Sequence, residues 1–473
     1  DCRMWECPDF FNVAPGVTAF KFSDQERGRR PFSADFYVLG DAGLTNYTAA
    51  LVQDGKDAYS AILGGAPYPA RLLDWGAVYA SKSWQDARGR RLWLGWVYEE
   101  SRGCPGVCSD GTPFVHSIQK WQGSQTLVRV IEYEPQAQAL LLKPVPELSL
   151  LRAAFGALFS ANLTLPASPP PASAPAPATA AAAGTLNTTA SGKNASEPPL
   201  QPSIVTLLPE TPPAWPPAPV ASGAGARAAP HSPSGRRQVE ASLNFTLSLA
   251  AANSSAAGGG AAAAVATPLS GSSTGSNSSG TGGDDGDADA FSAPFELGIR
   301  LLTGNGSIVR VLLNGTAKLV ASQPEPAAGG NSSDAAGLAA KAVRAGNSTQ
   351  KQMVAYNMGV YVDKRKAGGM TQTNVQGGTM PLPPGGVPAE GLQLHVFVDH
   401  SVLEVYALGG RGVITSRIYE VPLLPPDAPP EAGADLTALG QWGIEAFSSW
   451  AAGVVQVEAE VYELESCWVQ SVL

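Results

Sequence analysis

Residues 73–84 of this 473-residue chain read Leu73-Asp74-Trp75-Gly76-Ala77-Val78-Tyr79-Ala80-Ser81-Lys82-Ser83-Trp84. The run mixes aromatic and β-branched residues, and apolar positions do not recur in it at helical spacing. Three further segments of this kind lie at 33–40, 91–98 and 126–133, and Gly, Pro, Asp and Asn fill the gaps between them. Short strands with such turn punctuation predict an antiparallel β fold, either a sandwich or a propeller, and periodicity does not choose between the two.

Charge and composition exclude several classes of protein. The net charge is -9 with a pI near 5.1, and Lys and Arg form no patch, which argues against nucleic acid or an anionic membrane surface as a partner. No apolar run approaches the roughly 20 residues of a membrane-spanning helix. The five cysteines are too few for a disulfide scaffold and wrongly spaced for a zinc site, so no metal is expected. Cys104 and Cys108 could close a small loop or remain a free pair.

Composition and periodicity change after residue 145. Apolar residues at helical spacing predict a connecting helix or linker over 146–163. Residues 164–291 are a low-complexity insertion of Ala, Pro, Ser, Thr and Gly, in which disorder is expected because there is little to bury. Within it, residues 239–247 alternate like a half-buried strand.

The C-terminal part, 292–473, returns to strand patterns. Segments 295–302 and 307–313 predict a hairpin, and a meander is predicted over 392–398, 402–407 and 413–419. Insertions are expected near 322–350 and 365–390. His400 and Glu404 lie in the meander, where we expect them to satisfy turn amides rather than to act as an acid and a base.

Glycosylation signals are dense. Eleven Asn-x-Ser/Thr tripeptides favour a secreted or vacuolar glycoprotein carrying N-glycans on some of them. Their asparagines are Asn46, Asn162, Asn187, Asn194, Asn244, Asn253, Asn277, Asn305, Asn314, Asn331 and Asn347.

One carboxylate near the N-terminus has a setting that suits acid catalysis. Residues 4–11 read Met4-Trp5-Glu6-Cys7-Pro8-Asp9-Phe10-Phe11, so Glu6 lies between an indole and a rigid Cys-Pro unit. Such surroundings can raise a carboxyl pKa and make a general acid. A solvated Glu at a strand edge is the alternative that the octapeptide alone leaves open.

Four motifs in order carry a family resemblance. Residues 4–10 resemble the Met-Trp-Glu-Cys-Pro-Asp-Phe motif of glycoside hydrolase family 32, the invertases and fructan-cleaving β-fructofuranosidases. Residues 73–84 are similar to the family's Asp-Tyr-Gly-x-x-Tyr-Ala-Ser-Lys-Thr-Phe segment, and 90–97 to its Arg-Arg-x-x-Trp-Gly-Trp strand. Residues 117–129 resemble the stretch that follows. The meander near 392–419 resembles the centre of the family's C-terminal β-sandwich.

The resemblance implies a fold and a mechanism. Residues 1–145 would form about blades 3 to 5 of a five-bladed β-propeller, and 292–473 a β-sandwich. Glu6 would be the acid/base of a retaining hydrolysis that needs no cofactor. Such a mechanism needs a second carboxyl about 5–5.5 Å away. In the family this nucleophile and a third acid precede the Glu-Cys-Pro motif, so this chain is expected to begin after them and to be inactive as it stands.

The same resemblance implies substrate-binding residues, namely Asp74, Trp75, Tyr79, Lys82, Trp5 and Cys7. The substrate would be sucrose or a small fructan, and the location secreted, at the cell wall or vacuolar. In the family, the Asp that matches Asp74 favours sucrose over long fructans. A Lys expected three residues later is Ala77 in this chain, which weakens the inference of a sucrose preference. Two other functions stay open: a catalytically dead, invertase-like carbohydrate-binding protein, and a glycosylated structural protein of the cell wall.

Overall fold

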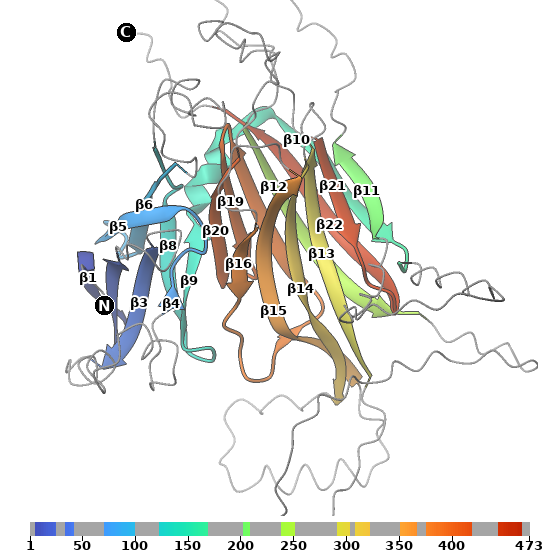
Figure 1. Ribbon diagram of the computed structural model, residues 1–473, viewed down its shortest axis with the longest axis horizontal. Helices are drawn as coiled ribbons and strands as arrows, with labels where there is room; N and C mark the ends of the chain where they lie inside the picture. The colour runs from blue at the N-terminus through green and yellow to red at the C-terminus, as the bar shows by residue number, and fades with distance from the viewer. Residues whose placement is uncertain are drawn as a thin grey trace, which may run out of the picture.

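The computed structural model describes residues 5–24, 34–41, 71–99, 123–168, 202–208, 238–250, 291–302, 308–321, 351–366, 375–418 and 443–465. Within these ranges every element is a β-strand except one 3-10 helix, η2 (Pro146–Leu151). The strands form four antiparallel sheets, two in the N-terminal part and two in the C-terminal part (Figure 1). The predicted all-β fold class is confirmed.

The N-terminal part holds two small sheets, each with four strands in a row. The first has the order β1 (Trp5–Ala14), β2 (Val17–Asp24), β3 (Ala34–Asp41), β4 (Arg71–Leu72). The second has the order β5 (Val78–Gln85), β6 (Arg91–Val97), β8 (Arg129–Glu134), β9 (Ala139–Pro144), and β7 (Ser124–Gln125) also pairs with β6. Four-stranded antiparallel sheets are the blades of propellers. The assignment of these sheets to about blades 3 to 5 of a five-bladed propeller stays a prediction.

The C-terminal part is a sandwich of two larger sheets (Figure 1). One has the order β10 (Arg152–Leu165), β22 (Gly453–Leu464), β12 (Gln238–Leu249), β18 (Leu392–Asp399), β19 (Val402–Ala407), β20 (Gly412–Arg417). The other has the order β11 (Ser203–Leu208), β21 (Gly443–Ser448), β13 (Ser292–Leu302), β14 (Ile308–Ala321), β15 (Lys351–Lys366), β16 (Val375–Thr379), and β17 (Val387–Pro388) also pairs with β15.

Strand alternation explains the sandwich core. In β12, the side chains at every second position from Val239 to Leu247 are buried, because successive strand residues point to opposite faces. They pack in one apolar cluster with β13 residues such as Leu297 and Ile299 of the opposite sheet. The strand predicted at 239–247, the pairing of 295–302 with 308–313, and the three-strand meander are confirmed. The turn residues 303–307 lie outside the described residues.

Three sequence predictions need correction. The helix expected over 146–163 is only η2, and the chain continues as β10 on β22. Apolar side chains such as Leu158 and Leu163 pack against the sandwich core from this strand, so sheet pairing outweighs their local spacing. The low-complexity segment also contains β11, and the insertion expected near 365–390 contains β16 and β17.

The two parts of the molecule meet along β20. The amide of Trp75 donates to the Val413 carbonyl (2.9 Å), and the amide of Ala77 donates to the Thr415 carbonyl (2.7 Å). Between them, a Cβ on Gly76 would lie 1.8 Å from the Thr415 carbonyl oxygen, so only glycine permits this approach. An apolar cluster that includes Tyr37, Trp93, Phe397 and Tyr406 extends the contact. The segment before β5 is therefore fixed on the sandwich.

Candidate active site

Glu6 lies on β1 beside an irregularity of the strand. The pairing of β1 with β2 shifts register between Glu6 and Asp9, and Cys7 has a φ of 48°. A β-bulge of this kind bends the strand and changes the direction of the neighbouring side chains. The positive φ of a non-glycine residue marks local strain of the sort that gathers at functional sites. Glu6 itself is half-buried.

A second bulge lies opposite, on β5. The pairing of β5 with β6 shifts register between Tyr79 and Lys82, and Ala80 has a φ of 53°. The Tyr79 hydroxyl donates a hydrogen bond of 2.6 Å to the Glu6 Oε2 atom. Two separate sheets therefore contribute one residue each to this pair.

Tyr79 acts as a neutral donor in this pair. Burial raises the pKa of the Tyr79 phenol well above its ordinary value, and the hydrogen bond to Glu6 raises it further. The phenol thus keeps its proton across the physiological range and can hold the Glu6 carboxyl in one orientation. A half-buried, oriented carboxyl is what general acid–base transfer requires.

Lys82 and Asp9 form a neighbouring pair. The Lys82 Nζ atom donates to Asp9 Oδ1 (2.5 Å) and to the Pro8 carbonyl (2.9 Å). The other Asp9 oxygen accepts from the Ser83 amide (2.7 Å) and hydroxyl (2.9 Å). The Lys82 side chain is 56% exposed, so part of it is free to meet a ligand. The contact between Asp9 and Lys82 joins β1 to β5 and becomes visible only in the fold.

Trp5 and Cys7 adjoin Glu6 on β1. Trp5 begins β1 and pairs with Asp24 of β2. Cys7 is a half-buried free thiol, and its carbonyl accepts a hydrogen bond of 3.2 Å from Lys21. The structure thus brings Glu6, Cys7, Tyr79 and Lys82 together at the facing bulges.

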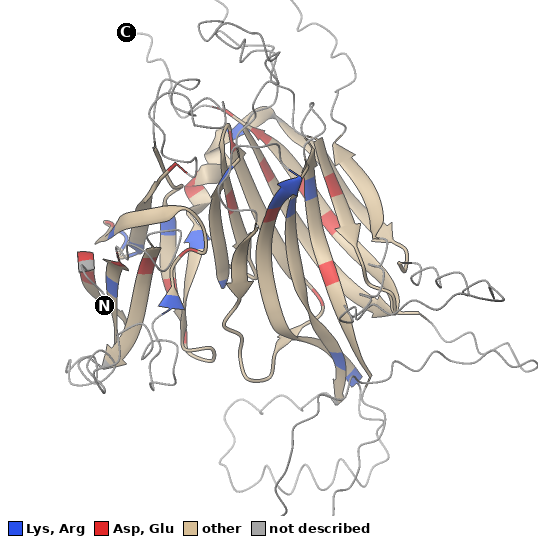
Figure 2. Cartoon of the chain, viewed as in Figure 1, with Lys and Arg blue, Asp and Glu red and all other residues tan. Residues whose placement is uncertain are grey.

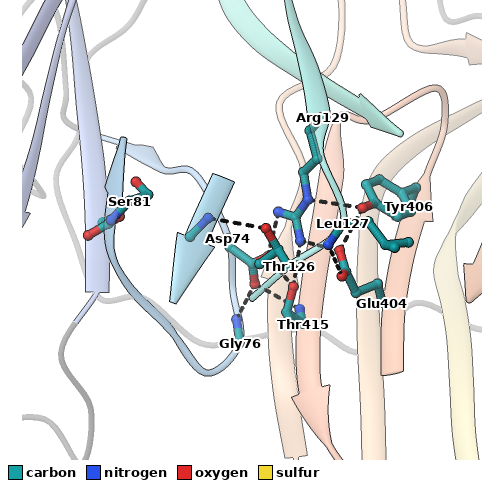
Figure 3. A network of polar contacts seen from close by, with 11 residues as sticks. Asp74, Gly76, Ser81, Thr126, Leu127, Arg129, Glu404, Tyr406 and Thr415 are labelled. Atoms are coloured by element: carbon teal, nitrogen blue, oxygen red, sulfur yellow. Dashed lines mark hydrogen bonds and ion pairs between the residues drawn. The ribbon is translucent and has the colours of Figure 1, made fainter. Parts of the chain in front are cut away.

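Asp74 lies elsewhere, at the junction with the sandwich (Figure 3). The neighbouring Trp75 is bonded to Val413 of β20 at the same junction. Asp74 is 3% exposed. Its Oδ1 accepts from the amides of Gly76 and Thr415, each at 2.8 Å, and its Oδ2 accepts from the Thr415 hydroxyl at 2.7 Å. Trp75 packs against the sandwich core, and its ring covers Gly378 of β16. These contacts tie both residues to the junction rather than to Glu6.

Arg129 is the centre of the junction network. Its Nη1 atom bonds Asp74 Oδ2 (2.7 Å), and its Nη2 atom bonds Glu404 Oε2 (2.6 Å). Glu404 also accepts from the Tyr406 hydroxyl (2.7 Å) and the Leu127 amide (2.5 Å). Arg129 is fully buried and stacks on Trp93, with 4.6 Å between the guanidinium carbon and the ring centroid.

Burial and charge act against each other in this network. Burial lowers the pKa of Arg129, but the electrostatic interactions with Tyr406, Glu404 and Asp74 outweigh it and hold that pKa above its ordinary value. Burial raises the pKa of Glu404, which the Arg129 charge opposes. Glu404 has a structural role, but the amide it binds belongs to Leu127, outside the meander, so the prediction that it satisfies a turn amide there is wrong. His400 contacts Asp399 at 2.8 Å.

Other features of the described residues bear on the site. No group of three or more His, Cys, Asp or Glu residues suited to a metal ion occurs within the described ranges. The helices found there include none of the length and apolar content needed to span a bilayer. Basic and acidic positions are interspersed over the strands (Figure 2).

Comparison with solved structures finds a fructan exohydrolase and an exo-inulinase among the similar chains. Fructan 1-exohydrolase IIa from Cichorium intybus aligns with 98% of this chain and 62% of its own, with 15% identity and a TM-score of 0.48. Exo-inulinase from Aspergillus awamori aligns with 14% identity and a TM-score of 0.43 over 98% of this chain and 57% of its own.

Sequence relatives match about a third of this chain. A cell wall isozyme of β-fructofuranosidase from Zea mays is 34% identical over 156 residues, which is 32% of this chain and 24% of that protein. A fructan 6-exohydrolase from Beta vulgaris is 29% identical over 164 residues, or 32% of this chain and 23% of that protein. The chain matches about a quarter of the length of these relatives.

Family models cover most of the chain. The glycosyl hydrolases family 32 N-terminal domain matches residues 1–144, and the family 32 C-terminal model matches residues 262–450. The first range holds both blade-like sheets, from β1 to β9, and the second holds most strands of the sandwich. The chain therefore belongs to glycoside hydrolase family 32.

Proposed function

We propose that this chain is part of a β-fructofuranosidase in which Glu6 is the acid/base. The observation that carries the proposal is the 2.6 Å hydrogen bond between the Tyr79 hydroxyl and Glu6, made across two facing bulges. In a retaining hydrolysis, Glu6 would give its proton to the leaving sugar oxygen and then take one from the incoming water. Its substrates would be sucrose and small fructans, in keeping with the names of the relatives.

The nearby acids of the described residues are poor candidates for the nucleophile. Asp9 is paired with Lys82, Asp35 with Lys21, and Asp74 with Arg129. A carboxylate held by a cation and by several donors is a weak nucleophile, because its electron pairs are already engaged. We therefore propose that the second carboxyl comes from outside the described residues. We also propose that the chain of residues 1–473 alone does not hydrolyse sucrose.

The remaining predicted site residues take separate parts in this proposal. Lys82 is placed to bind a sugar hydroxyl from the side of Asp9. Trp5 and Cys7 border Glu6 on the same strand. Asp74 and Trp75 hold the blade-like sheets on the sandwich and thereby position β5. The cell-wall isozymes among the relatives support a secreted or cell-wall location.

Fructose release from sucrose tests the proposal. The expressed chain should release none, whereas the chain fused behind the N-terminal catalytic segment of the maize relative should release it. In the fusion, Glu6→Gln should lower the rate about 10²- to 10⁴-fold, the usual contribution of a general acid. Glu132→Gln, at the exposed Lys143 pair, is the matched control. Turnover by the chain alone at an invertase-like rate, or a fusion indifferent to Glu6, would contradict the proposal.

Exposed aromatic residues favour a second candidate function. Trp84 and Trp96 are 40% and 49% exposed on the same sheet as Tyr79, and exposed aromatic faces suit stacking on sugar rings. A catalytically dead, invertase-like carbohydrate-binding protein would use them to hold fructan. Calorimetry with inulin-type oligosaccharides would then give heat without product, and Trp96→Ala would abolish that heat.

A further inference from the structure

A buried ion pair lies between the two bulges of the candidate active site. The Lys21 side chain on β2 is 1% exposed, and the Asp35 side chain on β3 has no exposed area. Lys21 Nζ and Asp35 Oδ2 are 3.3 Å apart, and Lys21 also donates to the Ser23 hydroxyl at 3.0 Å.

Each member of the pair holds the backbone of a bulge. Lys21 Nζ donates to the Cys7 carbonyl at 3.2 Å, inside the bulge of β1. The same atom donates to the Ser81 carbonyl at 2.5 Å, and Asp35 Oδ2 accepts from the Ser81 amide at 2.8 Å, inside the bulge of β5. The pair therefore joins the residue that follows Glu6 to the bulge that follows Tyr79.

Backbone strain at both bulges calls for such an anchor. Cys7 and Ala80 both have positive φ, a conformation that costs about 1–3 kcal/mol for residues with a side chain and persists only where the surroundings enforce it. Lys21 and Asp35 supply three hydrogen bonds to backbone groups of these two bulges. Ser81 lies well apart from the Asp74 network, so the junction does not provide the same support (Figure 3).

Stability alone is a weak reason for burying this pair. Taking two charges out of water costs several kcal/mol, and apolar replacements of buried ion pairs are often neutral or stabilising. In keeping with that cost, burial lowers the pKa of Lys21 despite its neighbour Asp35. The geometry of the contacts, rather than their net free energy, is what apolar side chains could not reproduce.

We propose that Lys21 and Asp35 are positioning residues, a buried clamp that holds the two bulges together and thereby aims Glu6 at its tyrosine partner. Neither residue touches the reacting atoms, and both act through the backbone. The role matters for catalysis only if Glu6 is the acid/base, so the inference rests on the proposed function. Its structural content can be measured without turnover.

Fluorine NMR of the expressed chain tests the clamp. With all twelve tyrosines replaced by 3-fluorotyrosine, the Tyr79 resonance is the one lost in Tyr79→Phe. The chemical shift of this resonance should change by a distinct step when Glu6 is replaced in Glu6→Gln, because the acceptor of the phenol's hydrogen bond changes. The step reports the hydrogen bond between the two side chains.

The decisive variant is the double substitution Lys21→Met with Asp35→Leu. It replaces the ion pair by apolar groups, so the chain should keep its melting temperature while the Tyr79 step is lost. Lys143→Met, on the exposed face of β9, should leave the step unchanged. A folded double variant with the step intact would overturn the proposal, since the pair would then be merely structural.

A conservative substitution gives an independent check that does not depend on the double variant folding. Asp35→Asn keeps an oxygen for the Ser81 amide, so the step should be retained in the folded variant; its loss from an Asp35→Asn chain that melts cooperatively would overturn the clamp. The result is separable from the proposed function. If the fusion is inactive but the Tyr79 step is present and is lost in the double variant, only the catalytic role is rejected. If the fusion is active but the Tyr79 step survives in the double variant, only the clamp is rejected.

Discussion

Removal of the Arg129 guanidinium should separate the two parts of the molecule energetically. In Arg129→Met, Asp74 and Glu404 remain buried without the cation that contacts both at 2.6–2.7 Å. Breaking a buried pair by removing one partner costs about 3–5 kcal/mol, because the remaining charge is not compensated. The loss of the stack on Trp93 adds to this cost. We expect urea unfolding, followed by tryptophan fluorescence, to shift to lower urea by the equivalent of about 3–5 kcal/mol.

The pH dependence of the Arg129→Met effect identifies its cause. Without the cation, burial should raise the folded-state pKa of Glu404 further above its unfolded value of about 4. The Glu404 carboxyl then binds its proton more tightly when folded. The destabilisation caused by this unpaired carboxyl is therefore absent below about pH 4 and grows as the pH rises toward the raised pKa. The variant should be less destabilised at pH 5 than at pH 7.

Two comparisons make the Arg129 prediction refutable. Arg88→Met removes an arginine whose side chain is 73% exposed and paired with Glu147, and it should not change the urea midpoint measurably. Arg129→Met combined with Glu404→Gln should recover part of the loss, because one uncompensated charge is gone. A destabilisation below about 1 kcal/mol, or one that does not vary with pH, would refute the reasoning from a buried charge network.

Three further predictions concern other sites. Burial raises the pKa of Glu240, but contacts with Arg152 and His395 outweigh it and hold this pKa at about 2. The lowering of the pKa from 4.5 to about 2 corresponds to about 3 kcal/mol of folding stability, which should be present above about pH 4.5 and be lost as the pH falls toward 2. Acid unfolding curves of Glu240→Gln should lack this contribution. Gly76→Ala should lower the melting temperature, with an overpacking cost of about 1–3 kcal/mol against the Thr415 carbonyl, whereas Gly385→Ala, with open space around it, should not. Tyr79→Phe in the active fusion should lower kcat more than it changes KM; the opposite pattern would show that the phenol binds substrate.

Local patterns in the sequence predicted many of the strands well. The alternating core positions of β12 and of the first half of β18 follow from the spacing of Val, Leu and Phe. β19 and β20 are buried at every position and were predicted from their strand-forming residues rather than from alternation. The segment 146–163 was predicted wrongly because its apolar residues satisfy a helical repeat, while their partners on β22 lie some 300 residues away in sequence. Pairing at such separation has no local signature.

The candidate site could be predicted only in part for a related reason. Glu6, Tyr79 and Lys82 stand in recognisable motifs, so the sequence singled them out. Lys21 and Asp35 do not, since their function depends on two bulges that bring strands of different sheets together. Asp74 was expected to meet substrate, and the buried Arg129 network that engages it becomes visible only once β20 is folded against the 74–77 segment.

The assignment of Glu6 as the acid/base is tested most directly by changing the leaving group. In the active fusion, Glu6→Gln should lower turnover of sucrose about 10²- to 10⁴-fold, because the leaving sugar needs a proton. β-Fructofuranosyl fluoride, whose fluoride leaves without one, should still form the fructosyl-enzyme at nearly the original rate, and added azide should restore its turnover. Equal losses on both substrates, with no rescue by azide, would contradict the assignment.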